Sequence, residues 1–209
     1  WRLLKGPEGP LAFTIKTKAG DIVTVQSSRP DWDTWTALTE DRGPYPPNFR
    51  WEMLPENIAY VELNSFGSPE ASQGFAENFE DISKADGIIF DVRKNGGGSS
   101  NYGYDVLSRL TQEPFAVSSW KTMTYRPAFR AWGYPTDSYE STGNTALPDP
   151  DQYYAGPVTV LSGTGTFSAA EDFLVAFDVM DRGPIIGQAS GGSTGQPLGF
   201  YLPGGGTAR

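Results

Sequence analysis

Hydrophobic and polar positions alternate near the start of the chain, in residues 11–26 (LAFTIKTKAGDIVTVQ). The alternation runs on both sides of Ala19, Gly20 and Asp21, so it predicts two strands joined by a turn, a β-hairpin. Residues 27–57 then contain five prolines and three tryptophans. Prolines at this density predict that no regular element forms there, and the aromatic side chains indicate a segment that packs over a neighbouring surface.

After residue 57 the pattern changes to short apolar runs separated by stretches with helical spacing. Ser68 is the predicted N-cap of the first helix, with Pro69 at its first position. The predicted strands are NIAYVELNSF (57–66), GIIFDV (87–92), AVSSWKTMTY (116–125), GPVTVLSG (156–163) and PIIGQ (184–188). The predicted helices are SPEASQGFAENFEDISKA (68–85), NYGYDVLSRLT (101–111) and SAAEDFLVAFDVM (168–180). Residues 126–156 read as a long polar excursion rich in proline and tyrosine, and residues 189–206 are predicted to turn and pair again.

This order of elements predicts an α/β fold, in which helices connect the strands of a largely parallel sheet. Ligands of such sheets bind at the carboxyl ends of the strands. Two glycine-rich loops follow strands at such ends, Gly96–Gly98 after the second strand and Gly163–Phe167 after the fourth. We therefore expect the functional chemistry between these two loops.

The composition excludes several classes of function. The net charge of −9 disfavours nucleic acids and anionic membrane surfaces as partners, because both require clustered Lys and Arg. The chain has no cysteine and no histidine, which excludes disulfides and a cysteine nucleophile and leaves only oxygen ligands for a metal. No Asp-rich calcium loop and no apolar run of about 18 residues occurs, so we expect no metal, no cofactor and no membrane span.

Ser168 lies between a Gly/Thr turn and the start of an apolar helix, in the stretch GTGTFSAAEDF (163–173). At such a helix start a serine is exposed, and the neighbouring N–H groups, including that of Ala169, are unpaired donors at the positive end of the helix dipole. A second donor can come from Gly96–Gly98, since three glycines let a backbone approach a ligand closely. Together these donors would form an oxyanion hole beside a serine nucleophile.

Each part of this arrangement also has a purely structural interpretation. Ser168 is a good N-cap, and Glu171 three residues later would complete a capping box. Gly96–Gly98 can be a tight strand-to-helix turn, and a phosphate cradle is disfavoured because the Lys-Ser/Thr signature of a P-loop is absent. Lys94 would be a candidate base only if it were desolvated.

Four segments occur in this order, each in a matching structural setting: VELNSF (61–66), FDVRKNGGGSS (90–100), GPVTVLSGTGTFSAAEDF (156–173) and IIGQASGGSTGQPLGFYLPGGG (185–206). With this combination the chain resembles the S41 peptidases, the tail-specific or C-terminal processing proteases, in the branch closer to the core of the tricorn protease. The resemblance covers most of residues 58–206, and the pair DVRKNGGG and TFSAAEDF is fairly specific.

The resemblance implies a ClpP/crotonase-like core of stacked ββα units over residues 58–209, truncated at its C-terminal end. Residues 1–30 look like the closing part of the PDZ domain that usually precedes this core, with residues 6–9 as the turn before its final strands. Residues 31–57 would be a Pro- and Trp-rich connector packed on the core. The resemblance also implies a periplasmic or extracellular location.

By the same resemblance, Ser168 is the nucleophile that forms an acyl-enzyme, and the substrate is a peptide or a protein. The other residues with implied roles are Gly97, Gly98 and Ala169 in the oxyanion hole, and Arg93, Asn95 and Glu171 as supports of the site.

The chain lacks the general base that this mechanism requires. The bacterial processing proteases of the family use a Ser-Lys dyad with the lysine after the nucleophile helix, but no lysine follows Lys121 here. The tricorn-like branch takes a histidine from a domain before the PDZ domain, and a chain that begins inside the PDZ remnant would lack it. We therefore expect the base to lie outside these 209 residues, and the chain alone to have little peptidase activity.

Two other functions stay open at this point. The chain can be a catalytically inactive module of the same fold that binds extended peptides or lipids. It can also be a crotonase-type acyl-CoA enzyme, which shares the core and the backbone oxyanion hole. Such an enzyme would not need Ser168, and it would need a basic patch for the CoA phosphates, which the sequence does not show. The sequence does not predict the oligomeric state.

Overall fold

The structure, a computed structural model, describes residues 9–29, 31, 33–34, 37, 45–203 and 207–208. The chain forms two compact units, Trp1–Pro46 and Pro47–Arg209. Most of the turn expected at residues 6–9 and much of the connector expected at residues 31–57 lie outside the described residues.

The first unit contains the β-hairpin that the alternating pattern predicts. Strand β1 (Gly9–Lys16) pairs antiparallel with β2 (Ile22–Arg29). The turn is closed by hydrogen bonds from the Thr17 N–H to the Asp21 carbonyl (2.8 Å) and from the Gly20 N–H to the Thr17 carbonyl (2.9 Å). Gly20 has a φ of 98° in this turn, a conformation that glycine adopts without strain.

The second unit is built on a five-stranded sheet with the strand order β11-β10-β5-β4-β3. Neighbouring strands are parallel except at one edge, where β3 pairs antiparallel with β4. The parallel strands and the helices between them confirm the predicted α/β fold. The strands are β3 (Phe49–Leu54), β4 (Ile58–Leu63), β5 (Gly87–Asp91), β10 (Val158–Ser162) and β11 (Ile185–Gly187).

Strand β3 shows that the expectation of no regular element in residues 27–57 was wrong. Its six residues fit between Pro47 and Pro55, and the strand lies at the sheet edge, where flanking prolines remove no hydrogen bond that the sheet needs. Trp51 lies opposite Val61 of β4. The short 3₁₀ helix η1 (Pro55–Asn57) then joins the two strands.

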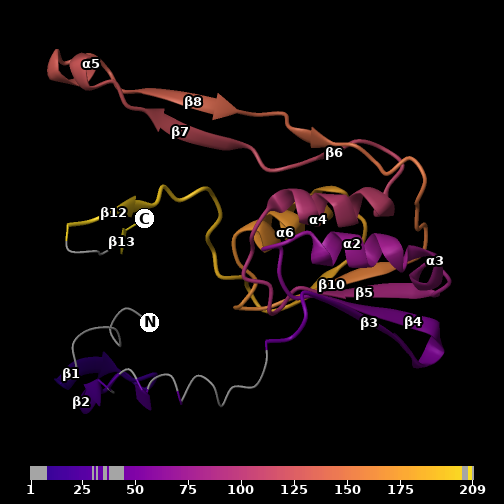
Figure 1. The fold of residues 1–209 in the computed structure, drawn as a ribbon, viewed down its shortest axis with the longest axis horizontal. Helices are drawn as coiled ribbons and strands as arrows, with labels where there is room; N and C mark the ends of the chain where they lie inside the picture. The colour runs from indigo at the N-terminus through magenta and orange to yellow at the C-terminus, as the bar shows by residue number, and fades with distance from the viewer. Residues whose placement is uncertain are drawn as a thin grey trace. The chain divides into compact units, whose positions relative to one another are not determined.

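Helices α2, α4 and α6 cover one face of this sheet (Figure 1). The helix predicted over residues 68–85 is interrupted at Asn78, whose side-chain amide donates a hydrogen bond to the Gly74 carbonyl (2.8 Å). Ser68 is not its N-cap, because the Ser68 hydroxyl instead accepts a hydrogen bond from Asn48 (3.1 Å). The helices are α2 (Glu70–Glu77), α3 (Phe79–Ile82), α4 (Ser100–Leu107), the 3₁₀ helix η2 (Ser108–Leu110) and α6 (Ala169–Val179).

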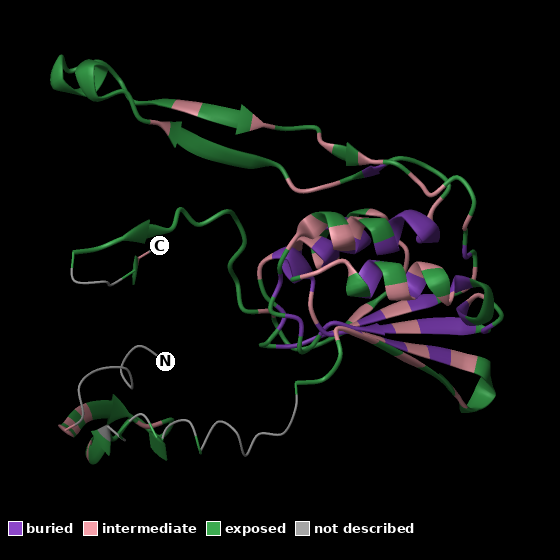
Figure 2. Cartoon of the chain, in the orientation of Figure 1, coloured by how far each residue is buried: buried purple, intermediate pink, exposed green. Residues whose placement is uncertain are grey.

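The core lies between the sheet and these helices, where Figure 2 shows the buried residues. Phenylalanine rings connect the two layers. Phe90 of β5 packs edge-on against Phe75 of α2 (centroids 5.3 Å apart) and against Phe173 of α6 (6.2 Å). Phe173 is fully buried, and burying a side chain of this size contributes roughly 2–3 kcal/mol to stability. This packing fixes the first turn of α6, where Ser168 lies, relative to the sheet.

Between α4 and β10 the chain forms two antiparallel pairs of strands, β6 with β9 and β7 with β8. The strand predicted over residues 116–125 is thus divided in two, and the excursion expected over residues 126–156 contains further elements. These elements are β6 (Phe115–Ala116), β7 (Trp120–Thr124), α5 (Pro127–Ala131), β8 (Asp137–Ser141) and β9 (Thr145–Ala146). Near the end, β12 (Phe200–Tyr201) pairs with β13 (Thr207–Ala208), as predicted. In the described part of the chain, no helix is long and apolar enough to cross a membrane.

Candidate active site

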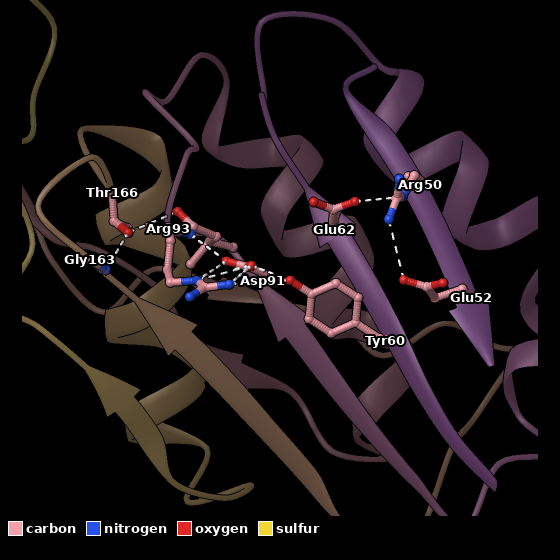
Figure 3. A network of polar contacts seen from close by, with 9 residues as sticks. Arg50, Glu52, Tyr60, Glu62, Asp91, Arg93, Gly163 and Thr166 are labelled. Atoms are coloured by element: carbon pink, nitrogen blue, oxygen red, sulfur yellow. Dashed lines mark hydrogen bonds and ion pairs between the residues drawn. The ribbon is translucent and has the colours of Figure 1, made fainter. Parts of the chain in front are cut away.

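Ser168 lies at the N-cap of α6, immediately after the tight turn that follows β10. The turn is fixed by Thr166, whose hydroxyl donates to the Val92 carbonyl at the end of β5 (2.8 Å) and accepts the N–H of Gly163 (3.1 Å; Figure 3). Ser168 itself has φ 57° and ψ −122°, a conformation that costs energy for a residue with a Cβ. The nucleophilic serines of known hydrolases occupy strained turns of this kind between a strand and a helix.

Ser168 and Glu171 form the capping box at the start of α6 that the sequence predicts. Glu171 stands at the third position of the helix, and its carboxylate accepts the Ser168 N–H (2.8 Å), which is one half of a capping box. The N–H of Glu171 points back toward Ser168, whose carbonyl oxygen accepts its hydrogen bond (2.7 Å). The Ser168 side chain therefore lies at the capping-box position.

The carboxylate of Glu171 holds the loop that follows β11 against the start of α6. Besides the Ser168 N–H, it accepts the Ser190 hydroxyl (2.7 Å) and the N–H groups of Gly192 (2.7 Å) and Ser193 (2.9 Å). Burial alone would raise the pKa of Glu171, but the Ser190 hydroxyl and the three N–H donors outweigh it and lower the pKa below its ordinary value. Glu171 is thus an ionised carboxylate that positions the backbone around it. Its hydrogen bonds come from three N–H groups and the Ser190 hydroxyl, so it is not the base that would take the proton of the Ser168 hydroxyl.

The loop also contacts Ser168 directly. The N–H of Ser168 donates to the Ser193 carbonyl (2.9 Å) in addition to Glu171. Residues 190–193 therefore fix the backbone of Ser168 from one side, and Glu171 fixes the loop. The sequence indicated Glu171 as a support of the site, but nothing in the pattern of residues 189–206 identified this loop as its partner.

Asn95 connects the two glycine-rich loops and is completely buried. Its side-chain amide donates to the Leu63 carbonyl at the end of β4 (2.9 Å), and its side-chain oxygen accepts the N–H of Gly97 (2.9 Å). Its backbone carbonyl accepts the N–H of Phe167, the residue before Ser168 (3.0 Å). The structure thus brings the loop at Gly96–Gly98 to the start of α6, as the sequence predicted.

Gly97 lies in contact with Ser168. A Cβ on Gly97, whose φ is 97°, would lie 2.7 Å from the Cβ of Ser168 and 3.0 Å from the backbone nitrogen of Ala169. The N–H of Gly97 is engaged by Asn95, whereas those of Gly98 and Ala169 have no hydrogen-bond partner among the residues described by the structure. In the described part of the chain, the unpaired donors here are thus the Ala169 N–H, directly after Ser168, and the Gly98 N–H, directly after Gly97.

Arg93 forms a network on the side of the sheet that the helices leave open (Figure 3). Its guanidinium pairs with Asp91 (2.6 Å) and donates to the Tyr60 hydroxyl (3.3 Å). Burial raises the pKa of Tyr60, as does its hydrogen bond to Asp91. For Asp91 burial acts upward, but the hydrogen bonds from Arg93 and Tyr60 prevail, and its pKa lies below the ordinary value. The network fixes the carboxyl end of β5, where the loop to Gly96–Gly98 begins.

Asp172 is a second carboxylate at the start of α6, and the sequence analysis did not identify it. It accepts hydrogen bonds from three hydroxyls in three different segments: Ser100 of α4 (2.6 Å), Ser118 between β6 and β7 (2.7 Å) and Thr194 after β11 (3.0 Å). Asp172 thereby ties α4, the helix that follows the glycine loop, to α6, the helix that begins after Ser168.

We expect Asp172→Ala to lower the free energy of unfolding by about 1–3 kcal/mol, because three hydroxyls lose a charged acceptor. Urea denaturation measures this change. The matched control is Asp178→Ala on the same helix, an exposed position at which we expect little change. Equal effects of the two substitutions would contradict a positioning role for Asp172.

The described residues show no general base at Ser168. No hydrogen bond links its hydroxyl to the side chain of a base among them, and Lys94, the one candidate in the neighbouring loop, is exposed. In the same part of the chain, no cluster of acidic side chains is arranged to hold a metal ion.

A strained serine between a strand and a helix of an α/β fold is an arrangement that known serine hydrolases use. Residues 57–209 match the model of peptidase family S41. The match covers well over half of the chain, and the chain belongs to peptidase family S41, a family of serine hydrolases. A search of curated protein sequences returns no significant match.

Solved structures share the fold. A candidate peptidase from Parabacteroides merdae matches with a TM-score of 0.59 at 24% identity, over 82% of this chain and 52% of that one. Mature CPAF matches with a TM-score of 0.61 at 17% identity, over 97% of this chain and 58% of that one. A candidate S41 protease from Bacteroides fragilis matches with a TM-score of 0.54 at 16% identity, over 95% of this chain and 52% of that one. The chain thus spans a little over half the length of the structures that it matches.

Proposed function

We propose that this chain is the nucleophile-bearing part of a serine endopeptidase that cleaves peptide bonds through an acyl-enzyme on Ser168. The observation that carries the proposal is the strained backbone of Ser168 at the start of α6, in contact with Gly97 of the glycine loop, where the N–H groups of Gly98 and Ala169 are unpaired among the described residues. In the reaction, the Ser168 oxygen attacks the scissile carbonyl carbon, the amine leaves, and water later hydrolyses the ester.

The two N–H groups would stabilise the oxyanion that forms on the carbonyl oxygen. In other serine hydrolases one such donor is worth about 3–4 kcal/mol of the activation barrier. Gly97 would allow the close approach of the loop to Ser168, and its own N–H would join the oxyanion hole only if Asn95 released it. Asn95 would support the arrangement by holding the loop at Gly96–Gly98, and Glu171 by holding the loop at residues 190–193, both through hydrogen bonds to backbone N–H groups.

We further propose that the general base comes from outside this chain segment. The hydroxyl proton of Ser168 must pass to a base, and the sequence contains no histidine to receive it. In the same proposal, the α/β core is of the ClpP/crotonase type and the β1–β2 hairpin is the end of a PDZ-like domain. The family resemblance also supports a periplasmic or extracellular location and a peptide or protein as the substrate.

Intact mass after treatment with a fluorophosphonate probe tests the proposal. We expect an adduct that depends on Ser168 in the longer protein from which we propose this chain derives, and little or none in the chain alone. Ser168→Ala in each protein is the control, and it should abolish the adduct. If neither protein forms an adduct, the peptidase proposal is wrong.

The second candidate function is a binding module for extended peptides or lipids. The observation in its favour is that Ser168 has no base among the described residues. It predicts reversible binding and no covalent adduct with the same probe, so one experiment separates the two candidates.

A further inference from the structure

The tip of the β7–β8 hairpin carries a group of exposed aromatic side chains that the active site does not use. Tyr125 and Trp132 are each 69% exposed, Tyr134 is 58% exposed and Phe129 is 42% exposed. They lie on and around the short helix α5. Contiguous exposed aromatic surface of this kind marks interaction sites, because water solvates it poorly.

These rings form an ordered cluster. Phe129 stacks on Trp132 (centroids 6.1 Å apart) and meets Tyr134 edge-on (5.4 Å), and Trp132 and Tyr134 are also in edge contact (6.2 Å). The cluster lines a hollow of about 480 Å³, whose wall also contains Tyr125, Pro135, Arg126 and Arg130. A hollow of this size accommodates a few residues of a peptide, and it is formed entirely by residues 124–137.

The charge of the hollow is opposite to that of the chain. Arg126 lies over the ring of Phe129 (5.3 Å), and neither Arg126 nor Arg130 forms an ion pair with any residue that the structure describes. Asp137 is the one carboxylate in the wall, and it accepts the N–H of Ser138 (2.9 Å). In a chain with a net charge of −9, this local excess of positive charge attracts acidic groups.

We propose that this aromatic tip, formed by Tyr125, Arg126, Phe129, Arg130, Trp132 and Tyr134, docks an acidic, proline-containing segment of the protein substrate. Aromatic walls bind extended proline segments because these lose little conformational entropy on binding, and guanidinium groups pair with carboxylates in a directed way. The proposal rests on the proposed peptidase function only in naming the bound peptide as part of a substrate.

The hairpin has a direct attachment to the nucleophile helix. β7 begins at Trp120, two residues after Ser118, whose hydroxyl donates to Asp172 of α6 (2.7 Å). A segment held at the tip would therefore be tethered to the same element that presents Ser168. Docking at such a site raises the effective concentration of the rest of the substrate.

Binding is measured without catalysis, on the Ser168→Ala chain, by fluorescence anisotropy. The probe is a fluorescein-labelled peptide of repeated Asp-Pro-Pro units. Two matched peptides replace Asp by Lys or both prolines by Gly-Ser. We expect the Asp-Pro-Pro peptide to bind, and each matched peptide to bind at least about tenfold more weakly. Equal binding of the three peptides would overturn the proposal.

Substitutions locate the site. Trp132→Ala and Arg130→Gln are expected to weaken binding of the Asp-Pro-Pro peptide at least about tenfold. Trp120→Ala and Lys121→Gln are the controls, since Trp120 stacks on Tyr139 (5.3 Å) and Lys121 pairs with Glu140 (3.2 Å), outside the hollow. If the controls weaken binding as much as the tip variants do, the proposed site is wrong.

The fluorophosphonate adduct separates this inference from the proposed function. Adduct formation in the longer protein without peptide binding would remove the docking site and leave the peptidase. Peptide binding without an adduct would leave a docking site in a protein that is not a peptidase. If the longer protein fails to bind the peptide that the chain binds, another part of the same protein covers the tip, and the proposal is overturned.

Discussion

Gly98→Ala is expected to lower the free energy of unfolding by about 3 kcal/mol or more, while Gly96→Ala, two residues away, is expected to change it by less than about 1 kcal/mol. A Cβ on Gly98 would lie 1.9 Å from the backbone oxygen of Phe66, and the φ of Gly98 is 137°. A Cβ on Gly96 meets no atom within 4 Å. The clash at Gly98 involves two backbones, so no change of side-chain rotamer relieves it.

Gly97→Ala is the informative third member of this series. Its Cβ would press on the Cβ of Ser168 and on the carbonyl of Phe167, each at 2.7 Å. We expect this variant to lose Ser168-dependent adduct formation in the longer protein. Urea denaturation of all three variants measures their free energies of unfolding, and the fluorophosphonate assay measures adduct formation at Ser168. Equal stabilities of the Gly96 and Gly98 variants would show that the loop does not approach Phe66 as closely as described.

Replacing Glu171 by glutamine is expected to lower the stability at neutral pH by about 2–4 kcal/mol, because a largely buried carboxylate loses its charge while four donors still face it. The effect depends on pH. The folded-state pKa of Glu171 lies below the ordinary value of 4.5, so its stabilisation is present above that value. The stabilisation is lost as the pH falls from the ordinary value through the folded-state pKa.

Urea denaturation of the wild type and of Glu171→Gln from pH 7 to pH 3 checks this prediction. The difference between the two proteins should be largest near neutral pH and should shrink below about pH 4.5. Glu113→Gln is the matched control, because Glu113 is exposed and its carboxylate forms no hydrogen bond with the described residues. A difference that stays constant with pH would show that Glu171 acts by packing and not by charge.

The sequence predicts most of the elements of this fold, and its errors have local causes. The hairpin turn at Ala19–Asp21 and the parallel strands are predicted correctly because the spacing of hydrophobic residues along the chain is enough to indicate them. Strand β3 was missed because the prolines on both sides indicated an irregular segment, although the six residues of the strand contain no proline. The interruption at Asn78 was missed because the side chain of Asn78 replaces a hydrogen bond of the backbone, and this choice depends on packing.

For the candidate site, the sequence predicts which two loops meet but not how their polar groups are shared. Ser168 and Gly96–Gly98 are recognisable because strand-to-helix turns with glycine have a strong local pattern. No local pattern indicates that Asn95 accepts the N–H of Gly97. The hydroxyl groups that donate to Asp172 come from segments far away in the sequence, so no local pattern indicates these contacts either. The domain boundaries and the source of the base stay predictions.

The strained backbone of Ser168 affects which residues natural selection keeps at this position. A serine held at φ 57° costs about 1 kcal/mol or more relative to glycine. A lineage that used this fold only for binding would gain stability, and lose nothing, by drifting to glycine at this position. Under the proposed function, reactivity at the hydroxyl offsets this cost, and glycine at the same position would mark relatives in which bond cleavage has been lost.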